Sequence, residues 1–200
     1  DSDEYAYKTT VFRVNGSANQ QGDSASNLTL EAGKILEVEF TNTYDLILGR
    51  MKLTKNVAIS GIGSITLDDV RSSLRFRITG PYNYNKTFTG ADLTEGGNAL
   101  LLTDLVPGTY IITEETTELD DYNLIRTEYV KNAASVNGKI ATVTVGPSKT
   151  TEEVTVIDFN NIYEKKKGSL KLIKTVTGDA QFSDIKGEIS FGISGPDGYT

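Results

Sequence analysis

Apolar and polar residues alternate along most of the chain, the pattern of strands with one buried face. The stretch Arg50–Val57 shows it most clearly, with Met51, Leu53 and Lys55 on one face. Similar alternation predicts further strands at Lys8–Val14, Ile35–Thr43, Arg75–Thr79, Ala99–Thr103, Thr109–Glu115, Leu124–Val130, Lys139–Val145 and Glu153–Asn160. No segment has a convincing 3.6-residue stripe, so the pattern predicts an all-β chain.

An internal repeat divides the chain. The twenty residues Val38–Val57 recur without a gap as Ile157–Val176, and eight of the paired positions are identical. The paired positions are 119 residues apart. A repeat at this distance is typical of one whole domain. We therefore expect residues 1–48 to be the C-terminal part of one repeat, 49–164 a complete repeat, and 165–200 the N-terminal part of a further repeat.

The complete repeat has about seven or eight short strands, which is the pattern of an antiparallel β-sandwich. If its first strand, Arg50–Val57, lies beside its last, Val154–Asn160, the chain enters and leaves at opposite ends of the domain. The predicted fold class is thus a tandem array of antiparallel β-sandwiches, and such units would form a rod.

Composition excludes several classes of function. The chain has neither Cys nor His, which excludes disulfides, thiol catalysis, zinc sites of the usual kind and His-based acid–base catalysis. Its net charge of −7 argues against nucleic acid as a partner. No apolar run reaches the length of a membrane span. The paired acids Asp68-Asp69 and Asp120-Asp121 could bind Ca²⁺, but such pairs in loops are ordinarily only solvated, so we expect no metal. We also expect no cofactor.

Three polar residues fall on faces that are otherwise apolar. Lys55 follows Met51 and Leu53, and Asn161 follows the apolar residues of the closing strand. Strand alternation from Tyr110 places Glu114 inward and Glu115 toward solvent. Simpler interpretations exist for two of them. The Lys55 amine could reach solvent from the strand end, and the Asn161 amide could be satisfied by turn backbone.

An amine, an amide and a carboxyl group at the ends of three apolar faces favour a self-catalysed isopeptide bond. Burial among apolar side chains lowers the pKa of a Lys, which must be neutral to attack. Glu114 would polarise the Asn161 carbonyl and relay protons while ammonia leaves. Folding supplies the proximity. The reaction occurs once per domain, so the protein is not expected to be an enzyme with turnover.

The motifs together resemble Cna B-type domains, the stalk modules of Gram-positive adhesins and pilins. They are GRMKLTK and GSLKLIK at the openings, FRITGP and FGISGP (Phe191–Pro196), LVPGTYIITEE, and the closing FTNTY and FNNIY. The resemblance implies a Lys55–Asn161 isopeptide bond with Glu114 as catalyst, although Ile112 stands where the family has Leu. It also implies that Asn42 and Lys174 have these roles in the incomplete repeats, whose partners this chain lacks.

The resemblance implies a structural stalk segment of an extracellular, cell-wall-anchored surface protein, with neighbouring domains as partners. The alternative function is a ligand-binding adhesin module that recognises a host extracellular protein or a glycan. Its candidate loops are Ser60–Ser72 and Tyr82–Gly97, where Tyr82 and Tyr84 could supply aromatic contacts. A groove lined by exposed aromatic side chains would favour the adhesin module.

Overall fold

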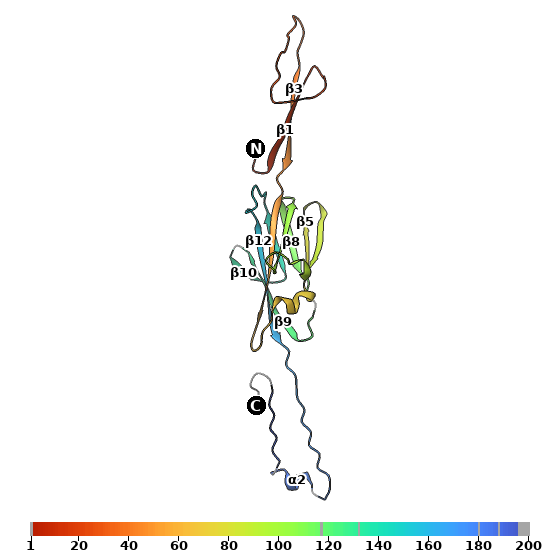
Figure 1. The fold of residues 1–200 in the computed structure, drawn as a ribbon, viewed down its shortest axis with the longest axis vertical. Coiled ribbons are helices and arrows are strands. Elements are labelled where there is room, and N and C mark those ends of the chain that lie inside the picture. The colour runs from red at the N-terminus through yellow and green to blue at the C-terminus, as the bar shows by residue number, and fades with distance from the viewer. Residues whose placement is uncertain (1, 117, 132, 180, 188, 196–200) are drawn as a thin grey trace.

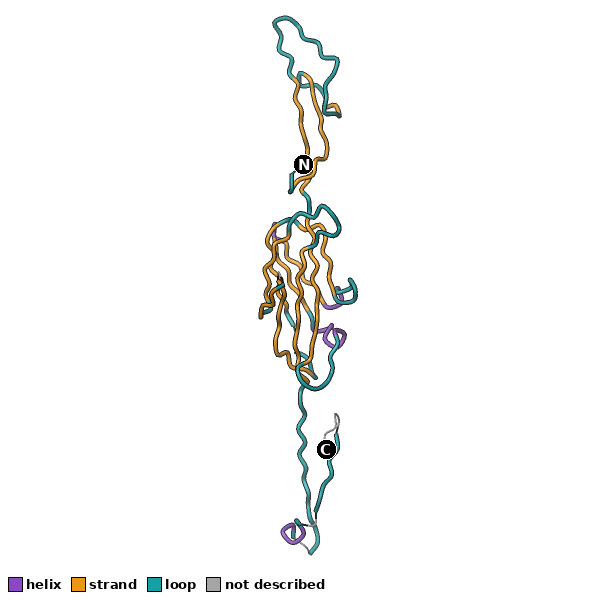
Figure 2. The backbone as a smooth tube through the Cα atoms, turned by 90° about the vertical axis from the view of Figure 1, so that its left-hand side faces the viewer, coloured by secondary structure: helices purple, strands orange, loops and turns teal. Residues whose placement is uncertain are grey.

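The protein is an elongated all-β chain. The computed structural model describes residues 2–116, 118–131, 133–179, 181–187 and 189–195. Pro196, the last residue of the FGISGP motif, lies outside the described residues. A small N-terminal sheet, a larger central body and an extended C-terminal segment follow one another along the long axis (Figure 1). The strands run roughly along the same axis (Figure 2).

The strands form three sheets. The N-terminal sheet has the order β2 (Gln20–Gln21), β1 (Tyr5–Val14) and β3 (Val38–Leu46). The five-stranded central sheet has the order β10 (Ala134–Asn137), β9 (Tyr122–Lys131), β12 (Thr155–Lys165), β4 (Gly49–Ile59) and β7 (Ala99–Leu105). The four-stranded sheet has the order β11 (Ile140–Val145), β8 (Gly108–Glu114), β5 (Arg75–Gly80) and β6 (Tyr84–Thr89).

Short helical turns occupy some of the connections. They are α1 (Leu67–Val70), η1 (Arg71–Ser73), η2 (Pro81–Asn83), η3 (Gly90–Asp92) and α2 (Phe182–Ile185). The first of them begins with a capping box, in which Asp69 accepts a hydrogen bond from the backbone of Thr66 at 2.7 Å. These turns lie outside the two central sheets and leave the strand framework intact.

The four- and five-stranded sheets pack face to face as a β-sandwich. The rings of Phe76 on β5 and Phe159 on β12, one from each sheet, lie 5.7 Å apart in the core. Met51, Leu53 and Ile157 are fully buried in the same core. The predicted all-β sandwich is therefore confirmed for the central body.

The first and last strands of the sandwich lie side by side, as the sequence analysis expected. β4 and β12 pair in parallel, with Lys55 opposite Phe159 and Val57 opposite Asn161. All other strand pairs described in the two central sheets are antiparallel. Because the central pair is parallel, the chain enters the body at one end and leaves at the other (Figure 1).

The two loops predicted to bind a ligand are more structured than expected. Residues 60–72 include α1, and residues 82–97 include the whole of β6, a strand absent from the sequence prediction. β6 is an edge strand that pairs with β5, and only Tyr84 and Phe88 pack against the core. Its sequence, YNKTFT, therefore carries little apolar alternation. β2 and β10, which are short, were also missed.

The close approach of β5 to β8 gives a test of the packing. A Cβ added at Gly80 would overlap the ring of Tyr110, a fully buried side chain, whereas a Cβ at Gly146 would meet open space. We predict that Gly80→Ala lowers the free energy of unfolding by about 1–3 kcal/mol, as overpacking does. Gly146→Ala is the matched control and should be close to neutral. Chemical denaturation measures both, and equal effects would contradict the packing described.

Candidate functional site

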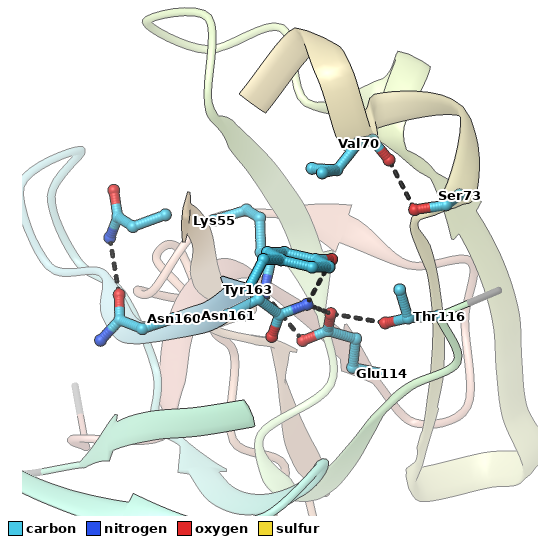
Figure 3. Close-up of polar contacts among 9 residues, drawn as sticks. Lys55, Val70, Ser73, Glu114, Thr116, Asn160, Asn161 and Tyr163 are labelled. Carbon is cyan, nitrogen blue, oxygen red and sulfur yellow. Dashed lines mark hydrogen bonds and ion pairs between the residues drawn. The ribbon is translucent and has the colours of Figure 1, made fainter. Parts of the chain in front are cut away.

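The three polar residues predicted to lie inward meet inside the sandwich. Lys55 comes from β4 and Asn161 from the adjacent β12, while Glu114 lies at the end of β8 in the opposite sheet. Their exposed fractions are 0%, 0% and 1%. Figure 3 shows the three side chains converging between the sheets. Solvent therefore does not reach the amine, the amide or the carboxylate.

The carboxylate of Glu114 contacts both of the other groups. Lys55 Nζ donates a hydrogen bond to Oε2 at 3.1 Å. Asn161 Nδ2 donates to Oε1 at 2.6 Å. One carboxylate thus bridges the amine and the amide, and it can accept a proton from the first and deliver it to the second.

Two further residues hold the site together, and the sequence analysis assigned neither a role in it. Thr116 Oγ1 donates to Glu114 Oε1 at 2.8 Å, and the hydroxyl of Tyr163 accepts from Asn161 Nδ2 at 3.2 Å (Figure 3). Tyr163 lies on β12, the same strand as Asn161. Its position two residues after Asn161, on the same strand face, was the signal that could have revealed the contact.

The strand register explains why Lys55 and Asn161 both reach Glu114. On β12, Phe159 lies opposite Lys55, and Asn161 is the next residue on the same face. The long Lys side chain can span this diagonal separation, whereas its backbone stays in the ladder. Parallel pairing of β4 and β12 therefore places an amine and an amide together at the same level of the core.

Burial changes the acid–base behaviour of the amine. Desolvation lowers the pKa of Lys55 to about 8, although the charge of Glu114 and its hydrogen bond act in the opposite direction. The positive charge of Lys139 lowers it slightly further. The neutral, nucleophilic amine is therefore accessible near neutral pH. Burial also raises the pKa of Tyr163, so its hydroxyl stays protonated.

The Asn161 carboxamide has a defined orientation. Its NH₂ group faces Glu114, because Nδ2 donates a hydrogen bond to Oε1 at 2.6 Å. The carbonyl oxygen Oδ1 is buried without a hydrogen-bond partner among the described residues. Glu114 is thus placed to exchange protons with the nitrogen atoms, whereas the sequence analysis expected it to polarise the carbonyl.

The other predicted site residues do not come together. Asn42 lies on β3 and is exposed, and its Oδ1 accepts a hydrogen bond from Thr10 Oγ1 at 2.6 Å. Lys174 is exposed in the C-terminal segment. Their roles in neighbouring repeats stay predictions. Glu115 faces solvent, as expected from strand alternation, and its carboxylate pairs with Arg77 at 3.2 Å.

In the part of the chain that the structure describes, no group of three or more His, Cys, Asp or Glu residues is arranged to hold a metal ion. Asp68 of the first Asp pair forms an ion pair with Arg71 at 2.9 Å. Within the described residues, no helix is both long enough and apolar enough to cross a bilayer.

Comparison with known proteins gives structural likenesses only. No family model and no curated protein matches the chain. A point mutant of the major pilin of Streptococcus pyogenes is 15% identical to this chain. The match covers 82% of this chain and 66% of the pilin chain, with a TM-score of 0.40. The major pilin subunit of Bacillus cereus is 8% identical, with coverages of 80% and 57% and a TM-score of 0.32.

A third similar structure is a Mobiluncus mulieris adhesin containing intramolecular disulfide, isopeptide and ester bond cross-links. It is 13% identical, with coverages of 83% and 61% and a TM-score of 0.33. The chain therefore spans less than two thirds of the length of these structures. They are pilins and an adhesin, the kinds of surface protein whose stalk modules the sequence motifs resemble. Because every TM-score is below 0.5, the function is inferred from the chain's own residues.

The buried ion pair gives a prediction that does not depend on any covalent bond. Lys55→Met leaves the Glu114 carboxyl group without its countercharge inside the core, and Lys55→Met/Glu114→Gln replaces that group with a neutral amide that still offers an acceptor to Asn161. We predict that the double variant is more stable than the single variant by about 3 kcal/mol at pH 7, because an unpaired buried charge is strongly destabilising. Chemical denaturation measures the difference. Equal stabilities would contradict the claim that Lys55 compensates a buried charge on Glu114.

Proposed function

We propose that Lys55 and Asn161 join in an intramolecular isopeptide bond, with Glu114 as the acid–base catalyst. The observation that carries this proposal is the contact of one buried carboxylate with both the amine and the amide. The three groups also lie on strands that hold them at high effective concentration.

The reaction proceeds from the geometry of the contacts. Lys55 Nζ gives a proton to Glu114 Oε2 and becomes a neutral amine, whose lone pair attacks Asn161 Cγ. In the tetrahedral intermediate the attacking nitrogen loses a second proton, and Nδ2 gains one through Glu114. The Cγ–Nδ2 bond breaks and ammonia leaves, while the remaining proton stays on Glu114 or passes to water. The product is a secondary amide, and no cofactor or oxidant is consumed.

The bond would change the response of the domain to force. It joins the first strand of the sandwich to the last, so tension entering at β4 passes through the Lys55 side chain to Asn161 and leaves along β12. Residues 56–160 would carry no load. Closing a loop of this length also stabilises the fold by about 4–5 kcal/mol in the loop-entropy description of cross-links. A chain without Cys gains in this way what disulfides supply elsewhere.

From these properties we infer a structural role. The domain would be a load-bearing stalk segment of an extracellular, cell-wall-anchored protein of the Gram-positive adhesin or pilin type. Its partners would be neighbouring domains of the same protein, with residues 1–48 and 165–200 belonging to adjacent repeats. Entry and exit of the chain at opposite ends of the body support an arrangement of such domains in series (Figure 1).

Ligand binding through loops is the second candidate, and one observation favours it. Tyr82 is 87% exposed on the turn before β6. Tyr84, the other candidate aromatic residue, packs its ring against Tyr110 at 5.5 Å and is not free to contact a ligand. A single exposed aromatic side chain is a weak basis for a binding surface, so the stalk function is preferred.

The covalent bond predicts a mass defect. The wild-type chain should weigh one ammonia less than its sequence, whereas Lys55→Ala, Glu114→Ala and Asn161→Ala should each have the calculated mass. Lys52→Ala, which removes a Lys from the other face of the same strand, is the matched control and should keep the defect. Intact-protein mass spectrometry measures all five proteins. A full-mass wild type, or a defect that survives Lys55→Ala, would contradict the proposal.

The stalk role predicts a specific response to pulling. Stretched between its ends in a single-molecule experiment, the wild-type sandwich should not release residues 56–160. Lys55→Ala should release them, with a gain in length of roughly 350 Å, since an extended chain spans about 3.3–3.6 Å per residue. Lys52→Ala should behave as the wild type. Release of the full length by the wild type would exclude a load path through the side chains.

A further inference from the structure

Two unpaired polar atoms of the core lie on adjacent strands at the reaction site. Among the described residues, the buried side-chain atoms without a hydrogen-bond partner are Arg50 Nε, Thr127 Oγ1 and Asn161 Oδ1. β9 and β12 pair antiparallel, and Thr127 lies directly opposite Asn161 in the register. Thr127 is 6% exposed and Asn161 is fully buried. Unpaired buried polar groups are rare in folded proteins, so two from one cross-strand pair call for an explanation.

The two atoms are chemically complementary. A hydroxyl can donate a hydrogen bond, and a carbonyl oxygen can accept one. Residues directly opposite each other in an antiparallel pair have Cβ atoms about 4.5–5.5 Å apart and point to the same face of the sheet. That this face is the buried one follows from the next pair, where the rings of Tyr129 and Phe159 lie 5.9 Å apart.

The reaction needs a hydrogen-bond donor beside Asn161 Oδ1. Negative charge develops on Asn161 Oδ1 when the Lys55 amine attacks Cγ. Glu114 is held against Nδ2, and the two substituents of a carboxamide diverge from Cγ, so the carboxyl group does not serve the oxygen in this arrangement. Tyr163 also lies on the Nδ2 side, with its hydroxyl 3.2 Å from that atom.

A bulge lies beside this pair. The register of β9 against β12 shifts between Ile162 and Tyr163, so that Tyr163 lies opposite Leu124 and one extra residue of β9 is left unpaired. Bulges increase the local twist of a strand and occur next to active sites, where they turn a side chain toward its target. A bulge just after the Asn161–Thr127 pair therefore has the location typical of bulges beside active sites.

We propose that Thr127 Oγ1 donates a hydrogen bond to Asn161 Oδ1 and stabilises the oxyanion of the tetrahedral intermediate. The inference rests on the proposed isopeptide reaction and adds a catalytic residue to it. Thr127 keeps its proton throughout, because the oxyanion collapses to a carbonyl as ammonia leaves. Glu114 handles the protons of the two nitrogen atoms, and Thr127 stabilises the charge on oxygen.

The test uses the rate of bond formation in the full chain. Wild type, Thr127→Val and Thr127→Ser are purified as unfolded chains, refolded by dilution, quenched with acid at intervals and weighed by mass spectrometry. Valine has the shape of threonine without the hydroxyl, and serine keeps the hydroxyl. Loss of one oxyanion donor slows acyl transfer by about a hundred-fold or more. We therefore expect Thr127→Val to lose ammonia about a hundred-fold more slowly, and Thr127→Ser to stay within a few-fold of wild type.

A matched pair separates this role from a structural one. Lys55→Ala and Lys55→Ala/Thr127→Val cannot form the bond, so circular dichroism of the two reports only what Thr127 does for folding. These variants should refold at similar rates. The pH profile is a second readout, because the rate should rise toward the Lys55 pKa of about 8 in both wild type and Thr127→Val.

The outcomes distinguish the two proposals. If the wild type loses ammonia and Thr127→Val does so equally fast, the role of Thr127 is overturned and the isopeptide bond stands. The role is also overturned if Thr127→Val slows refolding as much as bond formation, or if it only shifts the pH profile. If the wild type never loses ammonia, the proposed function fails first.

Discussion

The interior of the sandwich depends on one carboxylate. Glu114 carries a charge at a place that solvent does not reach, and a buried charge is tolerated only with a partner and hydrogen bonds. Lys55 supplies the countercharge, while Asn161 and Thr116 donate hydrogen bonds to the other oxygen. These contacts place the Lys55 amine and the Asn161 amide against the same carboxyl group, which can carry protons between them. The arrangement that satisfies a buried charge is therefore also the arrangement in which amide exchange can occur.

Strand order turns this local chemistry into a property of the whole domain. The two side chains that we propose to react belong to the first and last strands of the sandwich, which lie side by side in parallel. Antiparallel pairing would have brought both ends of the domain to the same side. With the parallel pair, a bond between β4 and β12 would carry the force that runs from the entry of the chain to its exit. The remaining strands would carry none of this force. The same topology explains why such domains would work in series.

Much of the site could be predicted from the sequence, because burial follows alternation. Met51, Leu53 and Lys55 on one strand, and Ile157, Phe159 and Asn161 on another, lie inward as the period-2 pattern indicates. The position of Thr127 opposite Asn161 could not be predicted in this way, because it depends on which residues face one another across strands. Thr116 and Tyr163 lie two residues from Glu114 and Asn161, but alternation does not say which neighbours on one face form hydrogen bonds. β6 was missed because an edge strand buries little of its surface, so its residues need not alternate.

The account depends most directly on the identity of the two joined residues. Tandem mass spectrometry of a proteolytic digest of the wild-type chain locates the bond. The account predicts a branched peptide in which the Lys55 side chain is joined to the Asn161 side chain, with ammonia lost at that junction. Recovery of Lys55 and Asn161 in separate, unmodified linear peptides would contradict it, and the sandwich would then be held together by non-covalent contacts alone.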